Sequence, residues 1–184
     1  GLSQQIATCR TARHRVFTFI ESDIVHDAKV VAIAVGDAYY LGVLSSSIHT
    51  CWAASTGGWL GVGNDSNYNH SECFVKFPFP ACTPEQQAKI RALGEQLDAH
   101  RKRQQALHPE LTITGMYNVL DRVRAIEVAS THRVDPLPAP LNAKEKKIYE
   151  QGLVGILKQL HQELDAAVAE AGETDSTMQG LADN

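Results

Sequence analysis

The stretch CFVKFPFPACTPEQQAKI, residues 73–90, most constrains the fold, because it joins two different kinds of structure. Aromatic and β-branched residues predict a strand over 72–77, and the two prolines that follow end it by removing backbone donors. Thr83 and Gln86 then have the spacing of a capping box, with a proline at the first helical position. We therefore expect a sheet-containing unit before this joint and a long helix over 84–107 after it.

Residues 1–80 predict a small mixed α/β unit. The segments 15–20 and 29–35 are rich in β-branched residues and indicate strands. Apolar residues then recur at steps of three or four over 38–55, which indicates one helix lying on the sheet. The segment 56–71 has four glycines and three asparagines, a composition typical of a long loop.

Residues 81–171 predict a helical spacer that resembles a coiled coil, so the expected fold class is α+β. After the helix over 84–107, a second helix is expected over 114–126, and Asn142 opens a third that runs to 171. The apolar seams expected on the first and third helices are Ile90, Leu93, Leu97 and Leu107, and Tyr149, Leu153, Ile156, Leu160, Leu164 and Ala167. Residues 172–184 have little apolar content, and we expect a disordered tail.

Composition and charge exclude some classes of protein. No apolar run approaches the roughly 18 residues that cross a bilayer, so no membrane partner is expected. Four cysteines without a C-x-x-C pair favour a reducing, cytoplasmic setting. The net charge is −4, and the one dense basic cluster is AHRKRQQ at 99–105. Such a cluster forms a solvated helix face or contacts a phosphate backbone.

The segment 56–71 is the first candidate for chemistry. Its glycines do not precede the G-K-[ST] of a phosphate-binding loop, which leaves a flexible surface loop or a loop that contacts bases. For base contact, Asn64, Asn67 and Asn69 offer paired donors and acceptors suited to adenine edges. Trp59 and Tyr68 offer flat faces.

Metal and nucleophile chemistry are weaker alternatives. His49, Cys51, His70 and Cys73 could supply four zinc ligands, but residues two apart on a helix point to different faces. Three serines, 45–47, precede His49 without the G-x-S-x-G elbow of a hydrolase. We therefore predict no metal site and no catalytic residue in this chain.

Five segments carry a resemblance to a known family. They are TARHRVFTF, VVAIAVGDAYYLGVLSSSIHTCWA, GVGNDSNYNHSECFVKFPFP, PELTITGMYNVLDRVRA and LNAKEKKIYEQGLVGILKQLHQELDAAV. In this order, over about residues 8–171, they resemble the C-terminal region of single-chain adenine-specific DNA methyltransferases of type IIL and IIG restriction–modification systems. The joint is also similar to the end of a target recognition domain in type I specificity subunits.

The resemblance implies that the two parts of the chain have different functions. Residues 1–80 would be the target recognition domain, which reads double-stranded DNA, and 81–171 would pack against the rest of the enzyme. The chain lacks the catalytic N-P-P-[YF] signature and a convincing strand-G-x-G block for S-adenosylmethionine. The cofactor and the methyl transfer to adenine N6 would therefore belong to an N-terminal methyltransferase domain of the parent. The residues after Ala171 depart from the aromatic ending of relatives.

The same resemblance, with the residue types, gives a set of expected DNA contacts. Arginine, histidine and serine side chains would contact phosphates, while amide, carboxylate and aromatic side chains would touch base edges. The residues are Arg13, His14, Arg15, Ser46, Ser47 and His49, and in the loop Trp59, Asn64, Asp65, Asn67, Tyr68 and Asn69.

Two other functions remain open on the sequence. A helical protein–protein interaction module would dimerise through the seam over 142–171 and show no salt-dependent affinity for DNA. A zinc-dependent or hydrolytic enzyme would retain about one equivalent of metal.

Overall fold

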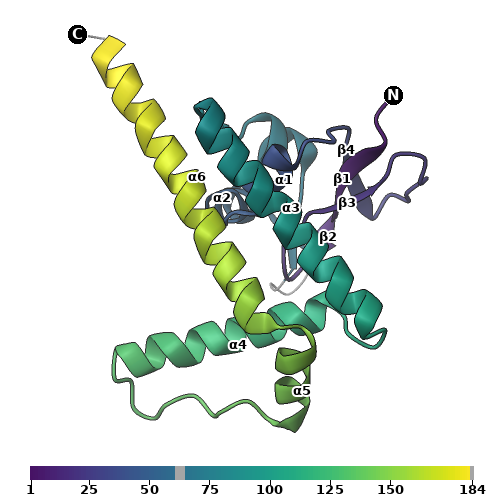
Figure 1. Ribbon diagram of the computed structural model, residues 1–184, viewed down its shortest axis with the longest axis vertical. Helices are drawn as coiled ribbons and strands as arrows, with labels where there is room; N and C mark the ends of the chain where they lie inside the picture. The colour runs from purple at the N-terminus through teal and green to yellow at the C-terminus, as the bar shows by residue number, and fades with distance from the viewer. Residues whose placement is uncertain (61–64, 183–184) are drawn as a thin grey trace. The chain divides into compact units, whose positions relative to one another are not determined.

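The computed structural model describes residues 1–60 and 65–182, with side chains over 1–59 and 65–173. Long helices and two small antiparallel sheets give an α+β fold, as predicted (Figure 1). The chain forms two compact units. The first comprises residues 1–98 together with the chain from His161 onward, and the second comprises 99–160. The predicted domain boundaries after residues 80 and 171 stay predictions.

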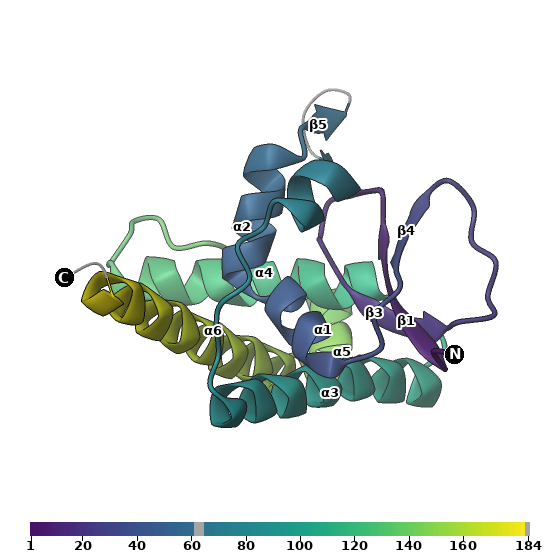
Figure 2. The ribbon, with the colours of Figure 1, turned by 90° about the horizontal axis from the view of Figure 1, so that it is seen from above.

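The main sheet of the first unit has three strands, seen side by side in Figure 2. β1 (Gln4–Cys9) lies in the centre and pairs antiparallel with β3 (Thr18–Glu21) and β4 (Val30–Ile33). The central strand is absent from the predicted elements, because QQIATC mixes polar and apolar residues. Ile6 of β1 is fully buried and lies opposite Phe19 and Ile33, which places the core on this face of the sheet.

The single helix predicted over 38–55 is two helices, α1 (Ala38–Ser45) and α2 (Ser47–Thr56). The break falls at Ser46, whose backbone is extended. Its hydroxyl donates to Val43 O (2.7 Å) and accepts from His49 N (3.3 Å), so it caps the second helix. Serine side chains compete in this way for the backbone groups of a helix, and three serines in a row end α1.

The predicted loop over 56–71 holds part of a second sheet and the start of a short helix. β5 (Trp59–Leu60) and β6 (Asp65–Asn67) pair antiparallel, and β2 (Thr11–Ala12) pairs with the other edge of β6. The strand predicted over 72–77 is wrong, because this segment is mostly the π-helix η1 (His70–Val75). Its central residue, Cys73, is fully buried and its amide donates to Asn69 O (2.7 Å).

α3 (Pro84–Leu107) confirms the long helix and its cap. Thr83 N donates to Gln86 Oε1 (2.9 Å) and Gln86 N donates to Thr83 Oγ1 (3.3 Å). Within the first unit α3 approaches α1 closely, since a Cβ on Gly94 would lie 2.4 Å from Ala38 O. The predicted seam is right for Ile90, Leu93 and Leu97, which are buried, and wrong for Leu107, which is 61% exposed.

The second unit contains α4 (Ile113–Thr131), α5 (Ala143–Gln151), the end of α3 and the start of α6 (Val154–Ala182). The predicted cap of α5 is confirmed, with Asn142 and Glu145 bonded in both directions at 2.9 Å. The predicted third helix breaks at residues 152–153. Gly152 lies against Met116, where a Cβ would come within 3.0 Å of that side chain.

This break changes which face of the predicted seam is buried. Leu160, Leu164 and Ala167 are buried as expected, whereas Tyr149, Leu153 and Ile156 are exposed, and Val154 and Leu157 are buried instead.

The basic cluster over 99–105 is not simply a solvated face. Arg101 and Gln104 are buried in the second unit, and the Arg101 guanidinium donates to the Tyr117 hydroxyl. Lys102 and Arg103 are exposed. In the described part of the chain, no helix is long and apolar enough to cross a membrane.

Candidate nucleic-acid interface

The small sheet brings two of the predicted DNA-contacting segments together. Ser66 in the middle of β6 lies opposite Ala12 on one side and opposite Trp59 on the other. The segment after β2 and the strands β5 and β6 are therefore neighbours, although they are about 50 residues apart in the chain. The predicted residues that this arrangement gathers are Arg13, His14, Trp59, Asp65 and Asn67.

These residues differ in their exposure to solvent. Arg13 and Asp65 are exposed and the Trp59 side chain is 57% exposed, while His14 and Asn67 are half-buried. A cation just after β2, an indole on β5 and a carboxylate on β6 are thus exposed around the small sheet. Asn64 lies outside the described residues.

Arg15 has a different position from the one predicted. Its Nη2 donates to Ser66 O (2.7 Å) and Ser66 Oγ (3.1 Å), and its Nη1 donates to Thr8 Oγ1 (3.3 Å) and to Cys9 O. The guanidinium lies 5.2 Å from the centre of the Tyr68 ring, and burial lowers its pKa. With these donors engaged inside the protein, Arg15 links the two sheets, and its phosphate contact stays a prediction.

Three other predicted residues are buried. Ser46, His49 and Tyr68 have no exposed surface, so they do not reach a base or a phosphate. A hydrogen bond of 3.2 Å joins the Tyr68 hydroxyl to His49 Nε2, and Phe77 packs edge-on against the imidazole at 4.6 Å. Burial, with the nearby charge of Arg15, lowers the pKa of His49 to about 3, and burial raises the pKa of Tyr68. Their expected DNA contacts are therefore corrected to a supporting role.

Ser47 is exposed but lies at the far end of α2 from the small sheet. A ten-residue helix is about 15 Å long, and β5 follows the other end, after Thr56. The Ser47 amide already donates to Asp165 Oδ1 of α6 (2.6 Å). A carboxylate therefore occupies the electropositive helix terminus that a phosphate would need.

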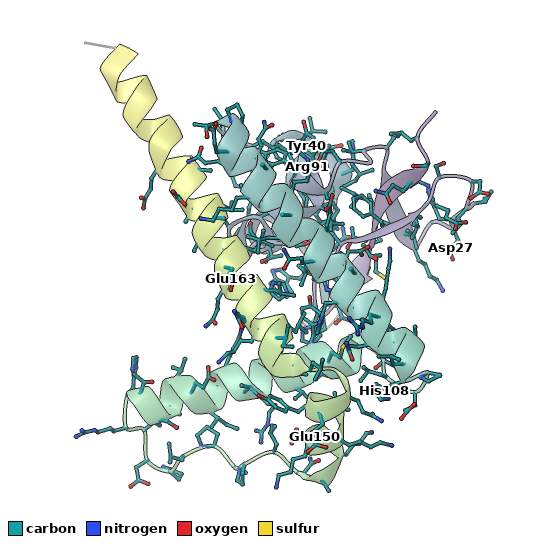
Figure 3. All side chains as sticks on the ribbon, viewed as in Figure 1. Asp27, Tyr40, Arg91, His108, Glu150 and Glu163 are labelled. Atoms are coloured by element: carbon teal, nitrogen blue, oxygen red, sulfur yellow. The ribbon has the colours of Figure 1, made fainter. Side chains whose placement is uncertain are left out.

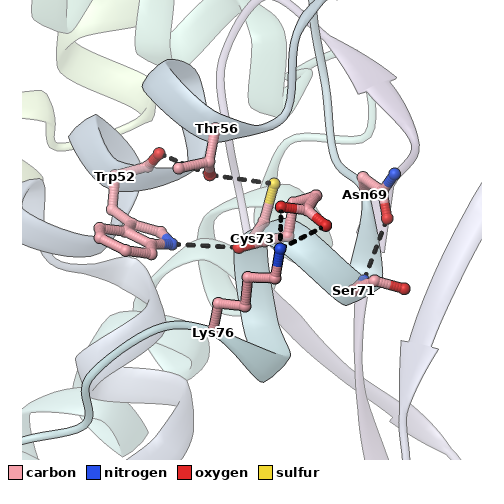
Figure 4. A network of polar contacts seen from close by, with 7 residues as sticks. Trp52, Thr56, Asn69, Ser71, Cys73 and Lys76 are labelled. Atoms are coloured by element: carbon pink, nitrogen blue, oxygen red, sulfur yellow. Dashed lines mark hydrogen bonds and ion pairs between the residues drawn. The ribbon is translucent and has the colours of Figure 1, made fainter.

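Asn69 caps η1, as Figure 4 shows: its Oδ1 accepts from Ser71 N at 3.0 Å. The same view shows how η1 is held. The Trp52 indole of α2 donates to Glu72 O (3.3 Å), and the carboxylate of Glu72 pairs with Lys76 (2.7 Å). Asn69 is exposed and lies two residues after the end of β6.

Two residues that shape the small sheet, Ser66 and Gly57, are absent from the set predicted from the sequence. Ser66 accepts both hydrogen bonds from Arg15 Nη2. Gly57 ends α2 where β6 passes so closely that a Cβ would lie 2.0 Å from Asn67 O. The alternating burial of Asp65, Ser66, Asn67 and Tyr68 is the period of a strand, but asparagine-rich composition concealed it.

The β3–β4 loop has the opposite electrostatic character. It carries Asp23 and Asp27, the latter labelled in Figure 3, against the single cation Lys29, and Glu21 at the end of β3 adds a further carboxylate. Phosphates repel such a cluster. This loop is therefore a poor candidate for DNA contact, and the small sheet is the better one.

His49, Cys51, His70 and Cys73, the four residues considered as zinc ligands, differ in burial. Cys73 is buried with its Sγ 3.7 Å from Ala53 O, and Cys51 is exposed. Among the residues that the structure describes, no group of three or more His, Cys, Asp or Glu side chains could hold a metal ion.

In its fold, the chain is similar to part of a type IIL restriction–modification enzyme. The solved structure is that of MmeI in complex with DNA, with a TM-score of 0.63 and 18% sequence identity. The match covers 93% of this chain and 18% of the MmeI chain, so this chain spans less than a fifth of that enzyme's length. No family model matches the chain, and no curated protein matches its sequence.

Proposed function

We propose that this chain is the sequence-specific DNA recognition segment of a site-specific adenine-N6 DNA methyltransferase of the restriction–modification type. One observation carries the proposal: the fold matches MmeI, solved in complex with DNA, over 93% of this chain. The small sheet supports it with suitable chemistry, because a cation just after β2 and hydrogen-bonding side chains on β6 are exposed there.

The residues that would touch DNA are fewer than the sequence predicts. Arg13 would contact a phosphate, and His14 would lie beside it. Asp65 would accept from a cytosine amine, and Trp59 would pack on a base or sugar face. Asn67 and Asn69 would contact bases through their amide nitrogens, which can donate to adenine N7, because Asn67 Oδ1 is buried and Asn69 Oδ1 caps η1. Asn64 stays an expected contact.

The methyl transfer would take place elsewhere in the parent polypeptide. An N-terminal methyltransferase domain would hold S-adenosylmethionine and flip the target adenine out of the stack, in the reducing cytoplasm. Tyr149 on α5, Leu153 in the break after it and Ile156 on α6 are exposed apolar side chains of the second unit, called the apolar row below. This row supports packing of the second unit against such a domain, because apolar rows of this kind mark interaction surfaces.

The same row favours a second candidate, a helical protein–protein interaction module without DNA binding. In that case the row would pair with a second copy of the chain. The two candidates differ in whether duplex DNA binds at all.

Selection from a pool of random-sequence duplexes tests the proposal. At about 50 mM salt, where phosphate contacts are strongest, the wild-type chain should enrich a defined motif. Trp59→Ala should weaken binding to that motif, while Val75→Ala, at another exposed apolar residue, should not. A chain that enriches no motif and binds no duplex at low salt would overturn the proposal, and a stable dimer in sedimentation would then favour the interaction module.

A further inference from the structure

The β5–β6 hairpin is too small to hold its own position. β5 has two residues and β6 has three, and isolated hairpins of ordinary length are already marginal in water. Trp59 at its edge is mostly exposed and contributes little core. The position of the exposed side chains must therefore be set by contacts from beneath.

Arg15 provides the first of these contacts. Its guanidinium donates to the end of β1 through Cys9 O and to the middle of β6 through Ser66 O (2.7 Å). Ser66 is the residue that pairs with both neighbouring strands of the small sheet. A rigid fork of donors thus ties the small sheet to the main sheet, which a lysine could not reproduce.

Tyr68 and His49 provide the second contact beneath the hairpin. The Arg15 guanidinium lies over the Tyr68 ring at 5.2 Å, and the Tyr68 hydroxyl bonds to His49 Nε2 at 3.2 Å. His49 is fixed on α2 between Phe17 and Phe77, with ring centres at 5.4 and 4.6 Å. A continuous chain of buried contacts therefore runs from α2 through Tyr68 and Arg15 to β6.

We infer that Arg15, Tyr68 and His49 are positioning residues that hold the β5–β6 hairpin at the angle from which it reads sequence. The inference rests on the proposed function. None of the three touches DNA. They act through Ser66 and the backbone of the hairpin, so their loss alters sequence preference more than general affinity for duplex DNA.

Amide hydrogen exchange tests the positioning without DNA. The reporters are Asn67 N, which donates to Gly58 O (3.0 Å), and Tyr68 N, which donates to Arg10 O (2.7 Å). Arg15→Lys and Tyr68→Phe should each raise the ratio of their exchange rates to those of the β1 amides by about tenfold, a local opening. Arg10→Lys is the matched control, because the Arg10 side chain donates to Ala28 O instead (2.8 Å).

Two substitutions of His49 distinguish a positioning role from simple packing in the core. His49→Gln keeps a hydrogen-bonding group near the Tyr68 hydroxyl and should retain most of the wild-type ratio, whereas His49→Leu should not. If hairpin and β1 amides accelerate together, or if the hairpin amides do not change, the inference is overturned.

The DNA experiment compares the duplex selected by the wild-type chain with a scrambled duplex of the same composition. Arg15→Lys should reduce the preference for the selected duplex about tenfold and change affinity for the scrambled one less than about twofold. An unchanged preference in spite of a loosened hairpin overturns the inference. If the wild-type chain prefers neither duplex, the proposed function fails alone, and the exchange ratios still decide whether the three residues position the hairpin.

Discussion

At the scale of residues, Arg13 and Arg15 are two positions apart and have different tasks. Arg13 is exposed beside the small sheet, whereas the Arg15 guanidinium is enclosed by two backbone carbonyls and two hydroxyls. A cation is tolerated inside a protein only when its donors are satisfied in this way. Residue type alone predicts that both belong to the site, and the tertiary contacts separate the one that faces solvent from the one that supports it.

His49 makes stability depend on pH. Its pKa in the folded state is about 3, below the ordinary value near 6.5, because burial favours the neutral ring. The stabilisation is therefore complete above pH 6.5 and is lost as the pH falls from there toward 3. Between pH 7.5 and pH 5 we expect His49 to account for a loss of about 2 kcal/mol in the free energy of unfolding.

Urea unfolding of the wild type and of His49→Gln at both pH values measures this loss. The variant should be less stable at pH 7.5 but lose about 2 kcal/mol less on acidification. Equal losses in the two proteins would assign the acid sensitivity to other groups, such as His100, whose pKa burial also lowers.

At the scale of elements, the two capping boxes are predicted correctly from the sequence, whereas residues 72–77 are predicted wrongly as a strand. A cap depends on side chains within three residues of the helix terminus, so Thr83 and Asn142 suffice to locate two helix starts. A short apolar run has no such local signal and suits a strand or a helical turn equally. In the structure the segment is mostly a π-helix, which buries Cys73 in the first unit.

Close helix contact within the first unit gives a prediction for α1 and α3. Gly94→Ala would place a Cβ 2.4 Å from Ala38 O and 3.0 Å from Gly42 N. Because both neighbours are backbone atoms, the helices must move apart, and we expect the free energy of unfolding to fall by about 3 kcal/mol. Gly172→Ala is the matched control, since a Cβ there meets nothing within 4 Å, and it should stabilise α6 by up to about 1 kcal/mol. Equal stabilities of the two variants in urea would contradict this account of the contact.

At the scale of the whole molecule, charge is divided unequally. The first unit has seven Lys and Arg against 15 Asp and Glu, and the second has ten against six. The unit that carries the candidate interface is therefore acidic overall. On the proposed function, its DNA contacts would depend on the local cation Arg13 and on hydrogen bonds, and general phosphate attraction would come from outside it.

The apolar row of Tyr149, Leu153 and Ile156 gives a prediction about association. An exposed apolar row promotes contact between copies, so the isolated chain should self-associate weakly at about 100 μM. Leu153→Glu should abolish this association in sedimentation without lowering the free energy of unfolding by more than about 0.5 kcal/mol. Lys146→Gln changes net charge equally outside the row and should leave association intact. A monomeric wild type would contradict the prediction.

The sequence by itself determined what depends on near neighbours: the α+β class, the span of α3 and the starts of α3 and α5. Only the tertiary structure decided that QQIATC forms the central strand, that residues 152–153 interrupt a helix, and that Tyr68 and His49 lie inside. The reason is physical. A cap is satisfied within one turn, but the burial of a side chain depends on which distant segments pack against it.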